Sequence, residues 1–518
     1  MLYQDFFDKA VANFPDNVAV VQDERNWSYR ELGRIVDQVA ASLIQNGLKA
    51  GERVAIYSPN DAMGYACQYG ALKAGGVWLP VNFRNGVEVT ASALADIKAN
   101  WLFIHSSLIS QVETIKTQAT SLKQIVCLDK AIGGHPSLQD WIAGVDTDVE
   151  FPRALSEDEC AVLLSSGTTG KPKGISVAHR AFASMIASFG VVYPIEKTPV
   201  HLVVAPITHA AGIYASTLLP GGAKQVLMTE FTPAAILSAI QEHKVTHLFL
   251  PPTIIYALLA YEDLAKYDVS SLVALLYGSA PMSHAKALLA HKTFGHALGQ
   301  GYGQSEALMI VTAFSPKDHA EAAENEHLRH RLKSIGREGP FVQTKIMSDD
   351  GRLLGDDEVG EIVLRGDIVM RGYLNNPEAD AEAKEFGWHH TGDLGYRDKD
   401  GFFYIVDRKR EMIISGGFNL FPSEIEQAIM THPSVENCAV VGIPHEKWGE
   451  AVHAAVQLNP VSEDVTDEDL ITHCKEAIGA MRAPKSIEFV GELPLSPVGK
   501  VLRRKVREPF WVSQERNV

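Results

Sequence analysis

The sequence predicts an α/β protein with a large N-terminal domain of stacked, mostly parallel sheets, a β-rich subdomain and a small α+β C-terminal domain. Three observations support this prediction. A chain of 518 residues is too long for a single hydrophobic core. Helical and strand patterns alternate through the first half of the chain, whereas shorter strand signals with glycine-rich turns follow from Ser334. A hydrophobic content of 46% with 21% charged residues is typical of a globular protein.

The alternation begins near the N-terminus. Apolar residues at helical spacing over 32–43 end at Gly47, and strand signals follow at 54–57 and 77–80. Helices between consecutive strands are typical of a parallel sheet that is covered on both faces. Further strands are expected at 200–206, 225–228, 247–250 and 272–277.

The second half of the chain predicts two smaller parts. Strands expected at 344–347, 361–365 and 402–406 form the β-rich subdomain, and the charged run 407–411 is the best candidate boundary. The predicted domains are therefore 1–409 and 410–518. In the second domain, Ser423 is expected as the N-cap of a helix, with Glu426 completing a capping box.

Composition restricts the partners and the compartment. A net charge of −16 argues against a nucleic-acid or anionic-membrane partner, so any anionic ligand must meet local positive charge. The five scattered cysteines fit a reducing compartment, and the N-terminus lacks a basic signal region. The most apolar stretch, 248–261, contains two prolines and is too short to span a membrane. We expect a cytoplasmic protein with no integral membrane segment.

A loop rich in glycine, hydroxyl and lysine residues follows the apolar run 161–164. Glycines expose backbone N–H groups and lysines add positive charge, which together favour phosphate binding. The loop is not a Walker A motif, because proline follows its first lysine. A mobile surface loop is the alternative. The sequence of the loop is Ser165-Ser166-Gly167-Thr168-Thr169-Gly170-Lys171-Pro172-Lys173-Gly174.

Six further motifs accompany this loop, at 206–212, 277–281, 300–306, 391–393, 407–408 and 496–503. In order and spacing, the whole set resembles the adenylate-forming superfamily of acyl- and aryl-CoA synthetases, peptide adenylation domains and firefly luciferase. The resemblance extends from about residue 5 to residue 507. It implies a mobile C-terminal domain and a two-step reaction that uses ATP, Mg²⁺ and coenzyme A. A carboxylate attacks the α-phosphate of ATP, and the CoA thiol then displaces AMP from the acyl-adenylate.

The resemblance also implies which residues bind ATP. Thr168, Thr169 and Lys173 would hold the β- and γ-phosphates together with backbone N–H groups of the loop, and Asp393 and Arg408 would hold the ribose. Ser305 stands where the family usually has threonine and keeps the hydroxyl near the AMP phosphate. The remaining nucleotide-binding residues implied are Ser165, Ser166, Gly167, Gly170, and an adenine slot of Ser279, Ala280, Pro281, Gln300, Gly301 and Tyr302. Tyr302 as a core residue, Asp393 as a turn acid and Arg408 as a surface arginine are the alternatives.

The implied catalytic residues are Glu306, Lys500 and His209. Glu306 would hold Mg²⁺, which prefers oxygen ligands, and Lys500 would contact both the attacking carboxylate and the α-phosphate. A solvated acid and part of a basic surface are the alternatives for these two. Arg410 stands at the family's hinge. Gly416 and Gly417 would let the pantetheine arm of CoA pass close to the backbone, or would simply form a β-turn.

His209 would head the wall of the acyl pocket, although it could also be a core histidine. Among the implied lining residues there is no obvious fixed positive charge and no acid to meet an α-amino group, which favours a hydrophobic or aromatic monocarboxylate. Small residues at 278, 301 and 303 leave room for a ring or a medium-length chain. The implied lining residues are His209, Gly212, Ile213, Tyr277, Gly278, Gly301, Gly303 and Ala307.

The leading hypothesis is an AMP-forming carboxylate–CoA ligase. The alternatives are a stand-alone adenylation enzyme that loads a carrier protein, a non-catalytic ATP- or AMP-binding protein and, remotely, a luciferase-type oxygenase. The expected partners are a small carboxylic acid, ATP and CoA, and a homodimer is left open.

Overall fold

The computed structural model describes the chain except for residues 166–172, 281, 460–464, 496–500 and 512–518. It divides into two compact units. The first comprises Met1–Thr344 and Leu364–His389, and the second comprises Lys345–Val363 and His390–Val518. Part of the predicted β-rich subdomain therefore groups with the C-terminal part of the chain. The boundary at 409/410, which concerns the expected hinge, remains a prediction.

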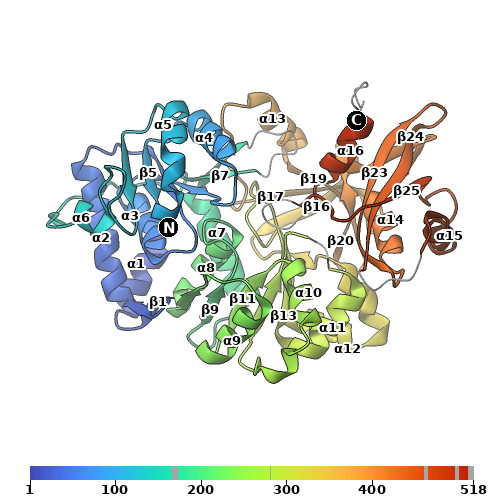
Figure 1. Ribbon diagram of the computed structural model, residues 1–518, viewed down its shortest axis with the longest axis horizontal. Helices are drawn as coiled ribbons and strands as arrows, with labels where there is room; N and C mark the ends of the chain where they lie inside the picture. Colours follow the sequence, from blue (N-terminus) through green and yellow to red (C-terminus); the bar gives the residue numbers. More distant parts are fainter. Residues whose placement is uncertain (166–172, 281, 460–464, 496–500, 512–518) are drawn as a thin grey trace. The chain divides into compact units, whose positions relative to one another are not determined.

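The described part of the first unit contains two large sheets, one of nine strands and one of seven (Figure 1). In spatial order, the nine-stranded sheet is β15 (Arg337–Glu338), β14 (Thr312–Phe314), β13 (Leu298–Tyr302), β12 (Ala274–Tyr277), β11 (His247–Leu250), β9 (Val200–Val203), β10 (Lys224–Leu227), β1 (Val18–Gln22) and β2 (Arg25–Ser28). The seven-stranded sheet is β18 (Gly372–Tyr373), β8 (Gly174–Ala178), β7 (Glu159–Leu164), β4 (Val77–Val81), β3 (Arg53–Tyr57), β5 (Trp101–Ile104) and β6 (Gln124–Cys127).

Parallel pairing dominates the centre of both sheets. The pairs β9–β10, β9–β11, β11–β12 and β12–β13 are parallel, as are β3–β4, β3–β5 and β4–β7. On β3, Val54 and Ile56 pack into one apolar cluster, whereas Ala55 and Tyr57 pack into another. Both faces of this strand are therefore covered, as a parallel sheet requires. The predicted α/β class is confirmed.

Helices supply the covering layers of the first unit. The largest apolar cluster combines Trp78 of β4, Leu276 of β12 and Phe182 of α7 (His179–Val192), so it joins residues of both sheets. The helix expected over 32–43 is present as part of α2 (Tyr29–Gln45), and Ser28 and Glu31 form its capping box. The α-helices are α1 (Tyr3–Asn13), α2 (Tyr29–Gln45), α3 (Ala62–Lys73), α4 (Val87–Asp96), α5 (Val112–Gln118), α6 (Leu138–Trp141), α7 (His179–Val192), α8 (Ala210–Thr217), α9 (Pro233–His243), α10 (Pro252–Ala260), α11 (His284–Phe294), α12 (Pro316–Glu324) and α13 (Pro377–Glu382).

The second unit is α+β. Most of a four-stranded sheet lies in it, in the order β16 (Val342–Met347), β17 (Gly360–Gly366), β19 (His389–Arg397) and β20 (Phe403–Arg408). A second sheet contains β22 (Phe418–Leu420), β21 (Ile413–Ser415), β24 (Gly449–Leu458) and β23 (Val435–His445), with β25 (Ser486–Phe489) beside β24. Helices α14 (Pro422–Ile429) and α15 (Asp467–Ile478) pack beside this sheet in Figure 1, and α16 (Arg503–Arg507) contacts β23.

The start of α14 corrects one expectation. Ser423 is not the N-cap, because the helix begins at Pro422, a residue type favoured in the first helical position. The backbone N–H of Ser423 donates instead to Asp407 Oδ2 at 2.7 Å. Glu426 accepts the N–H of Val440 at 2.8 Å, so the predicted capping box is wrong. The carboxylate at this helix N-terminus comes from β20, which local sequence does not reveal.

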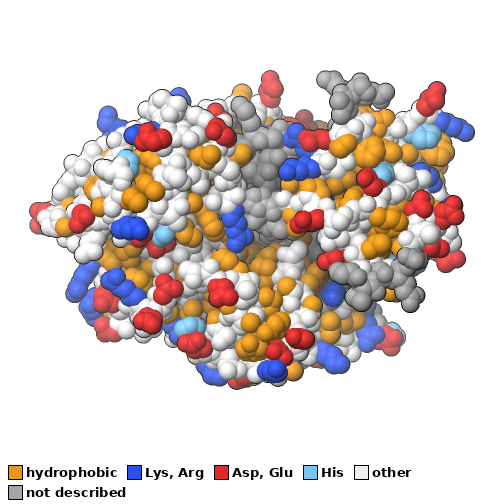
Figure 2. Space-filling view, in the orientation of Figure 1, with side chains coloured by type: hydrophobic (Ala, Val, Ile, Leu, Met, Phe, Trp, Pro, Cys, Tyr) orange, Lys and Arg blue, Asp and Glu red, His pale blue; other side chains and the backbone are white. Residues whose placement is uncertain are grey.

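The surface agrees with the composition. On the face shown in Figure 2, acidic and basic side chains of the first unit are interspersed. The five cysteines are all unpaired and buried. Among the described residues, no helix combines the length and the apolar character needed to cross a membrane.

His179, at the start of α7, should make stability depend on pH. Its Nδ1 accepts the backbone N–H of Tyr3 at 3.0 Å, and burial lowers its pKa from 6.5 to about 4. Between pH 6.5 and pH 4, His179 is therefore protonated in the unfolded chain but neutral in the folded chain. The free energy of unfolding decreases as the pH falls through this window.

Asparagine at position 179 can keep an acceptor near the place of Nδ1 but cannot be protonated. We predict that His179→Asn makes the pH dependence of unfolding shallower by up to about 1.4 kcal/mol per pH unit in this window. Urea denaturation of wild type and variant between pH 7 and pH 4 measures the difference. Parallel pH profiles would show that His179 does not remain neutral in the folded chain.

Candidate active site

The flanks of the predicted phosphate loop are joined by antiparallel pairing. β7 pairs with β8 so that Leu164 lies opposite Gly174. Beyond them, the N–H of Ser165 donates to the carbonyl of Lys173 at 3.0 Å, and the N–H of Lys173 donates to Ser165 Oγ at 2.9 Å. The expected strand before the loop is thus present, and both ends of the loop are fixed to each other. Residues Ser166 to Gly170 lie outside the described residues.

Lys173 and Glu306 are linked through a residue that the sequence did not single out. Lys173 Nζ lies 4.9 Å from the centroid of the Tyr373 ring, a cation–π contact. The hydroxyl of Tyr373 donates to Glu306 Oε1 at 2.9 Å. The structure therefore brings the predicted phosphate lysine and the predicted magnesium ligand to one tyrosine, the lysine over its ring and the carboxylate at its hydroxyl. A Gly-Tyr pair in a short strand offers no local signal for such a role.

A tight turn presents the Glu306 side chain. The N–H of Gln304 donates to the carbonyl of Ala307 at 2.8 Å, and the N–H of Ala307 returns a bond to Gln304 at 3.2 Å. Ser305 lies inside this turn. The carbonyl of Glu306 accepts the N–H of Met370 at 2.8 Å, which fixes the backbone beside the carboxylate.

The predicted adenine slot lies where two parallel strands end. Tyr277 of β12 is in register with Gln300 of β13, so the segments that follow them leave the sheet at the same edge. The carbonyl of Gln300 accepts the hydroxyl of Tyr193 at 2.9 Å. Ser279 has a φ of 69°, an unfavourable conformation for a residue with a side chain that is typical of functional turns. Ala280 follows it, and Pro281 lies outside the described residues.

At three of the implied pocket glycines, neighbouring backbone leaves no space for a side chain. A Cβ at Gly212 would lie 1.7 Å from the carbonyl oxygen of Ile207, and one at Gly278 would lie 2.9 Å from that of Gly301. A Cβ at Gly303 would lie 2.6 Å from the backbone nitrogen of Met309. The absence of side chains at 212, 278 and 303 therefore gives no information on the size of the acid. Of the four implied pocket glycines, only Gly301 could carry a Cβ at an ordinary contact distance, 3.8 Å from its nearest neighbour, Ile310 Cδ1.

His209 precedes α8 and is half-buried. Burial lowers its pKa, and the Arg84 guanidinium acts in the same direction, so the imidazole is neutral near pH 7. Its Nδ1 lies 3.2 Å from Thr208 Oγ1. Arg84 is a positive charge near the implied pocket that the sequence analysis missed, because it lies in an earlier loop.

The other implied pocket residues are mostly core. Tyr277 is 1% exposed, packs in an apolar cluster and has its hydroxyl 3.4 Å from His319 Nε2. Ile213 and Ala307 are also buried in the core, whereas Tyr302 is partly buried against it. The alternative interpretation of Tyr302 as a core residue thus agrees with its packing, and Tyr277 also packs as a core residue.

In the second unit, the two predicted ribose residues come together. Asp393 of β19 lies opposite Arg408 of β20 in an antiparallel pair, and Arg408 Nε lies 3.3 Å from Asp393 Oδ1. Asp393 is 4% exposed, and its N–H donates to Thr391 Oγ1 at 3.1 Å. Gly392, between Thr391 and Asp393, has a φ of 71°, which glycine adopts without strain. The Thr-Gly-Asp motif is therefore part of strand β19, and strand pairing fixes its buried carboxylate beside an arginine.

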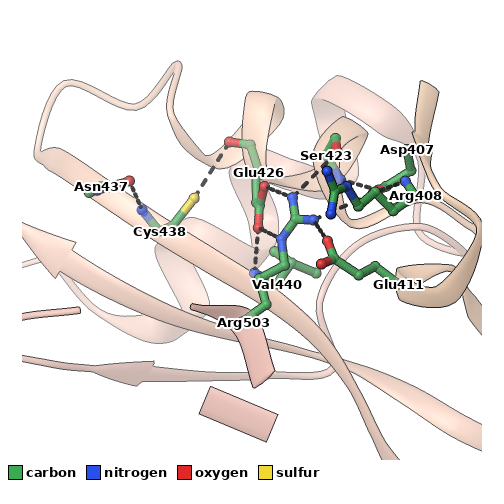
Figure 3. Close-up of polar contacts among 9 residues, drawn as sticks. All are labelled: Asp407, Arg408, Glu411, Ser423, Glu426, Asn437, Cys438, Val440 and Arg503. Carbon is green, nitrogen blue, oxygen red and sulfur yellow. Dashed lines mark hydrogen bonds and ion pairs between the residues drawn. The ribbon is translucent and has the colours of Figure 1, made fainter. Parts of the chain in front are cut away.

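A partly buried arginine, Arg503, lies beside Asp407, the residue that precedes Arg408 in the chain (Figure 3). Arg503 Nε donates to Glu426 Oε1 at 2.7 Å, its other terminal nitrogens reach Glu426 Oε2 and Glu411, and its Nη1 lies 3.4 Å from Asp407. Burial opposes the charge, but the three carboxylates outweigh it and raise the pKa of Arg503. Arg503 thus connects the segment that contains Arg410 to α14. It follows the predicted catalytic Lys500 by three residues.

Gly416 and Gly417 form the two-residue turn of a hairpin between β21 and β22. Their φ values of 58° and 84° fit a turn with both central residues in the left-handed region, so the turn alternative is sufficient to explain both glycines. Arg410 is exposed in the short helix η7 (Lys409–Glu411). Lys500 lies outside the described residues, and its neighbours Leu495 and Val501 pair with each other.

Comparison with known proteins identifies the class. A family model described as "AMP-binding enzyme" matches residues 7–374, and "AMP-binding enzyme C-terminal domain" matches residues 424–500. The chain therefore belongs to the AMP-binding enzyme family, and the predicted membership of the adenylate-forming superfamily is confirmed.

Individual relatives and structural neighbours are named as CoA synthases, CoA ligases or an amide bond synthetase. Feruloyl-CoA synthase from Amycolatopsis sp is 34% identical over 96% of this chain and 96% of its own length. Medium/long-chain-fatty-acid–CoA ligase FadD8 from Mycobacterium tuberculosis is 37% identical over 82% of this chain and 74% of its own. Among solved structures, the amide bond synthetase McbA from Marinactinospora thermotolerans has a TM-score of 0.89 and 28% identity, covering 98% of this chain and all of that one.

Tyr373 provides a direct test of the arrangement around Glu306. Tyr373→Phe keeps the ring beside Lys173 but removes the hydroxyl that orients the carboxylate. Because hydrogen bonds to charged groups are strong, we predict that the rate of acid-dependent exchange between ATP and pyrophosphate falls about tenfold. The variant should also need more Mg²⁺ to reach half of its maximal exchange rate. Exchange measured against magnesium concentration gives both values. Tyr396→Phe, in β19, is the matched control; equal behaviour of the two variants would contradict a role for the Tyr373 hydroxyl.

Arg503 provides a test of the second unit. Arg503→Met leaves the carboxylates around it without their cation, and breaking a buried ion pair in this way costs about 3–5 kcal/mol. We predict faster hydrogen exchange in peptides from α14 and β23. At low pH, protonation of these carboxylates should restore part of the protection of these peptides against exchange. Arg504→Met, which removes an exposed pair with Glu508, should change exchange little. Unchanged exchange in Arg503→Met would show that the network does not stabilise this unit.

Proposed function

We propose that this chain activates a hydrophobic or aromatic monocarboxylic acid with ATP and Mg²⁺ and transfers the acyl group to CoA. The observation that carries the proposal is the Lys173–Tyr373–Glu306 contact. It joins the end of a loop suited to phosphates to a carboxylate suited to a hard cation. The class of reaction, that of an AMP-forming acid–thiol ligase, is confirmed by the feruloyl-CoA synthase and FadD8 relatives, because both are named as enzymes that form CoA thioesters.

The proposed adenylation depends on the placement of positive charge. Lys173 and the loop N–H groups would hold the departing pyrophosphate, while the fixed turn at Glu306 would hold Mg²⁺. Glu306 fits this cation, because the turn fixes its backbone and the Tyr373 hydroxyl orients Oε1, while Oε2 accepts no hydrogen bond from the described residues. Magnesium supplies charge neutralisation between the carboxylate and the triphosphate.

The second unit would contribute the remaining contacts. The Asp393 carboxylate can accept both ribose hydroxyls, and Arg408 beside it can donate to the same sugar. Lys500 would stabilise the charge that develops between the acid and the α-phosphate. The hinge at Arg410 and a CoA path over Gly416 and Gly417 complete the proposed two-step cycle.

The acid itself is proposed from the character of the pocket. His209 is neutral, and the described lining residues include no acid that would meet an α-amino group. The relatives act on an aromatic acid and on fatty acids, as their names state. A panel of ferulate and medium- and long-chain fatty acids therefore tests the substrate class by acid-dependent pyrophosphate exchange. No exchange with any of them would contradict the proposed acid class.

A cytoplasmic location is proposed from the five unpaired cysteines, which fit a reducing compartment. A carrier protein as the acyl acceptor remains the alternative to CoA. A free-thiol assay with CoA distinguishes the two acceptors. The homodimer remains a prediction.

A substitution at Lys500 tests whether adenylation and thioester formation depend on different residues. We predict that Lys500→Ala reduces pyrophosphate exchange by about two or more orders of magnitude, while CoA thioester formation from supplied acyl-adenylate largely survives. The neighbouring exposed residue Lys505 gives the matched control, Lys505→Ala, which should retain both. Equal loss of the two half-reactions in Lys500→Ala would contradict the proposed separation.

A further inference from the structure

Two histidines and a glutamate converge on the first unit, among residues to which the proposed reaction gives no role. His291 lies in α11, His296 in the short helix η4 (Gly295–Ala297), and Glu324 is the last residue of α12. The helices α11 and α12 contact each other, and both contact η4 (Figure 1). One ligand atom from each of the three side chains lies within 4.8 Å of the other two.

The distances fit the edges of a small coordination polyhedron. His291 Nε2 lies 3.4 Å and His296 Nε2 lies 2.8 Å from the same oxygen, Glu324 Oε1. Bonds of about 2.0–2.2 Å from zinc to nitrogen and oxygen place tetrahedral ligand atoms about 3.3 Å apart. The three atoms therefore need only small side-chain movements to surround one ion.

The burial of the three side chains favours this arrangement. His291 is 15% exposed, and its Nδ1 is buried without a hydrogen-bonding partner among the described residues, so Nε2 is its accessible nitrogen. The His296 ring stacks on the His291 ring at 5.6 Å, and its side chain is 73% exposed. Glu324 is 56% exposed. One ligand is thus held in place by packing, and the two exposed ligands can adjust.

An ordinary ion pair explains the cluster less well. An exposed ion pair contributes little to stability and needs only one histidine. Here two histidines, each through its own Nε2 atom, face one carboxylate oxygen. If both rings were protonated, two positive charges would lie side by side. A divalent ion bound to two neutral imidazoles and one carboxylate satisfies all three groups without that repulsion.

We propose that His291, His296 and Glu324 form a binding site for a divalent transition-metal ion of the zinc class. Two imidazoles and one carboxylate are ligands suited to Zn²⁺, with water completing the coordination. Mg²⁺ prefers oxygen ligands, so this site is distinct in chemistry from the one proposed at Glu306. The ion ties the end of α12 to η4, and thereby stabilises the start of β13, the strand that contains Gln300.

Equilibrium dialysis of the full chain against zinc chloride tests the site. The measurement contains no ATP, acid or CoA, so its result is independent of the proposed reaction. His296→Ala and Glu324→Gln change exposed side chains, and the folded state should survive both. The matched controls are His327→Ala and Glu321→Gln, which change exposed residues close to the cluster but outside it.

We predict that wild type and both controls bind one zinc ion that the two cluster variants lose or bind at least about tenfold more weakly. Zinc should also protect peptides from the end of α12 and from η4 against hydrogen exchange in wild type but not in His296→Ala. Equal stoichiometry and affinity in all five proteins, or no retained zinc in wild type, would overturn the proposal.

Discussion

The parallel register of β12 and β13 is the constraint on which the candidate active site depends. Because Tyr277 lies opposite Gln300, the segments that follow both strands leave the sheet at one edge and approach each other closely. The carbonyl of Gly301 fills the space where a side chain at Gly278 would lie, and Ser279 adopts a left-handed conformation. The same β13 leads directly into the turn that presents Glu306. The position of the proposed magnesium ligand is therefore a consequence of strand pairing in the sheet interior.

Electrostatic contacts in each unit then fix the side chains that the strands bring close. In the first unit, Tyr373 contacts both Lys173, through its ring, and Glu306, through its hydroxyl. In the second unit, Arg408 lies on Asp393, and Arg503 connects α14 to the segment that contains Arg410. A carboxylate that accepts one hydroxyl, as Glu306 does from Tyr373, keeps its second oxygen atom for a ligand. That property fits the magnesium-binding role proposed for Glu306.

Local patterns predicted the fold and the motifs but not the long-range contacts. The helix over 32–43 and the strand before the phosphate loop were predictable, because hydrophobic periodicity reports burial directly. The Ser423 capping box was wrong, because Asp407 from a distant strand takes the place of a local cap. Tyr373 was missed for the same reason, because Lys173 and Glu306 both lie far from it in sequence. The small residues at 278, 301 and 303 were predicted to make room for an acid, yet at Gly278 and Gly303 neighbouring backbone fills that room.

The central claim is that the acid attacks the α-phosphate of ATP, and oxygen labelling tests it most directly. Wild-type enzyme would be given ATP, Mg²⁺, CoA and a turned-over acid whose carboxylate contains ¹⁸O, and the nucleotide product would be analysed by mass spectrometry. The account predicts that each AMP released contains one oxygen from the acid. Formation of ADP, or of AMP without the label, would contradict it.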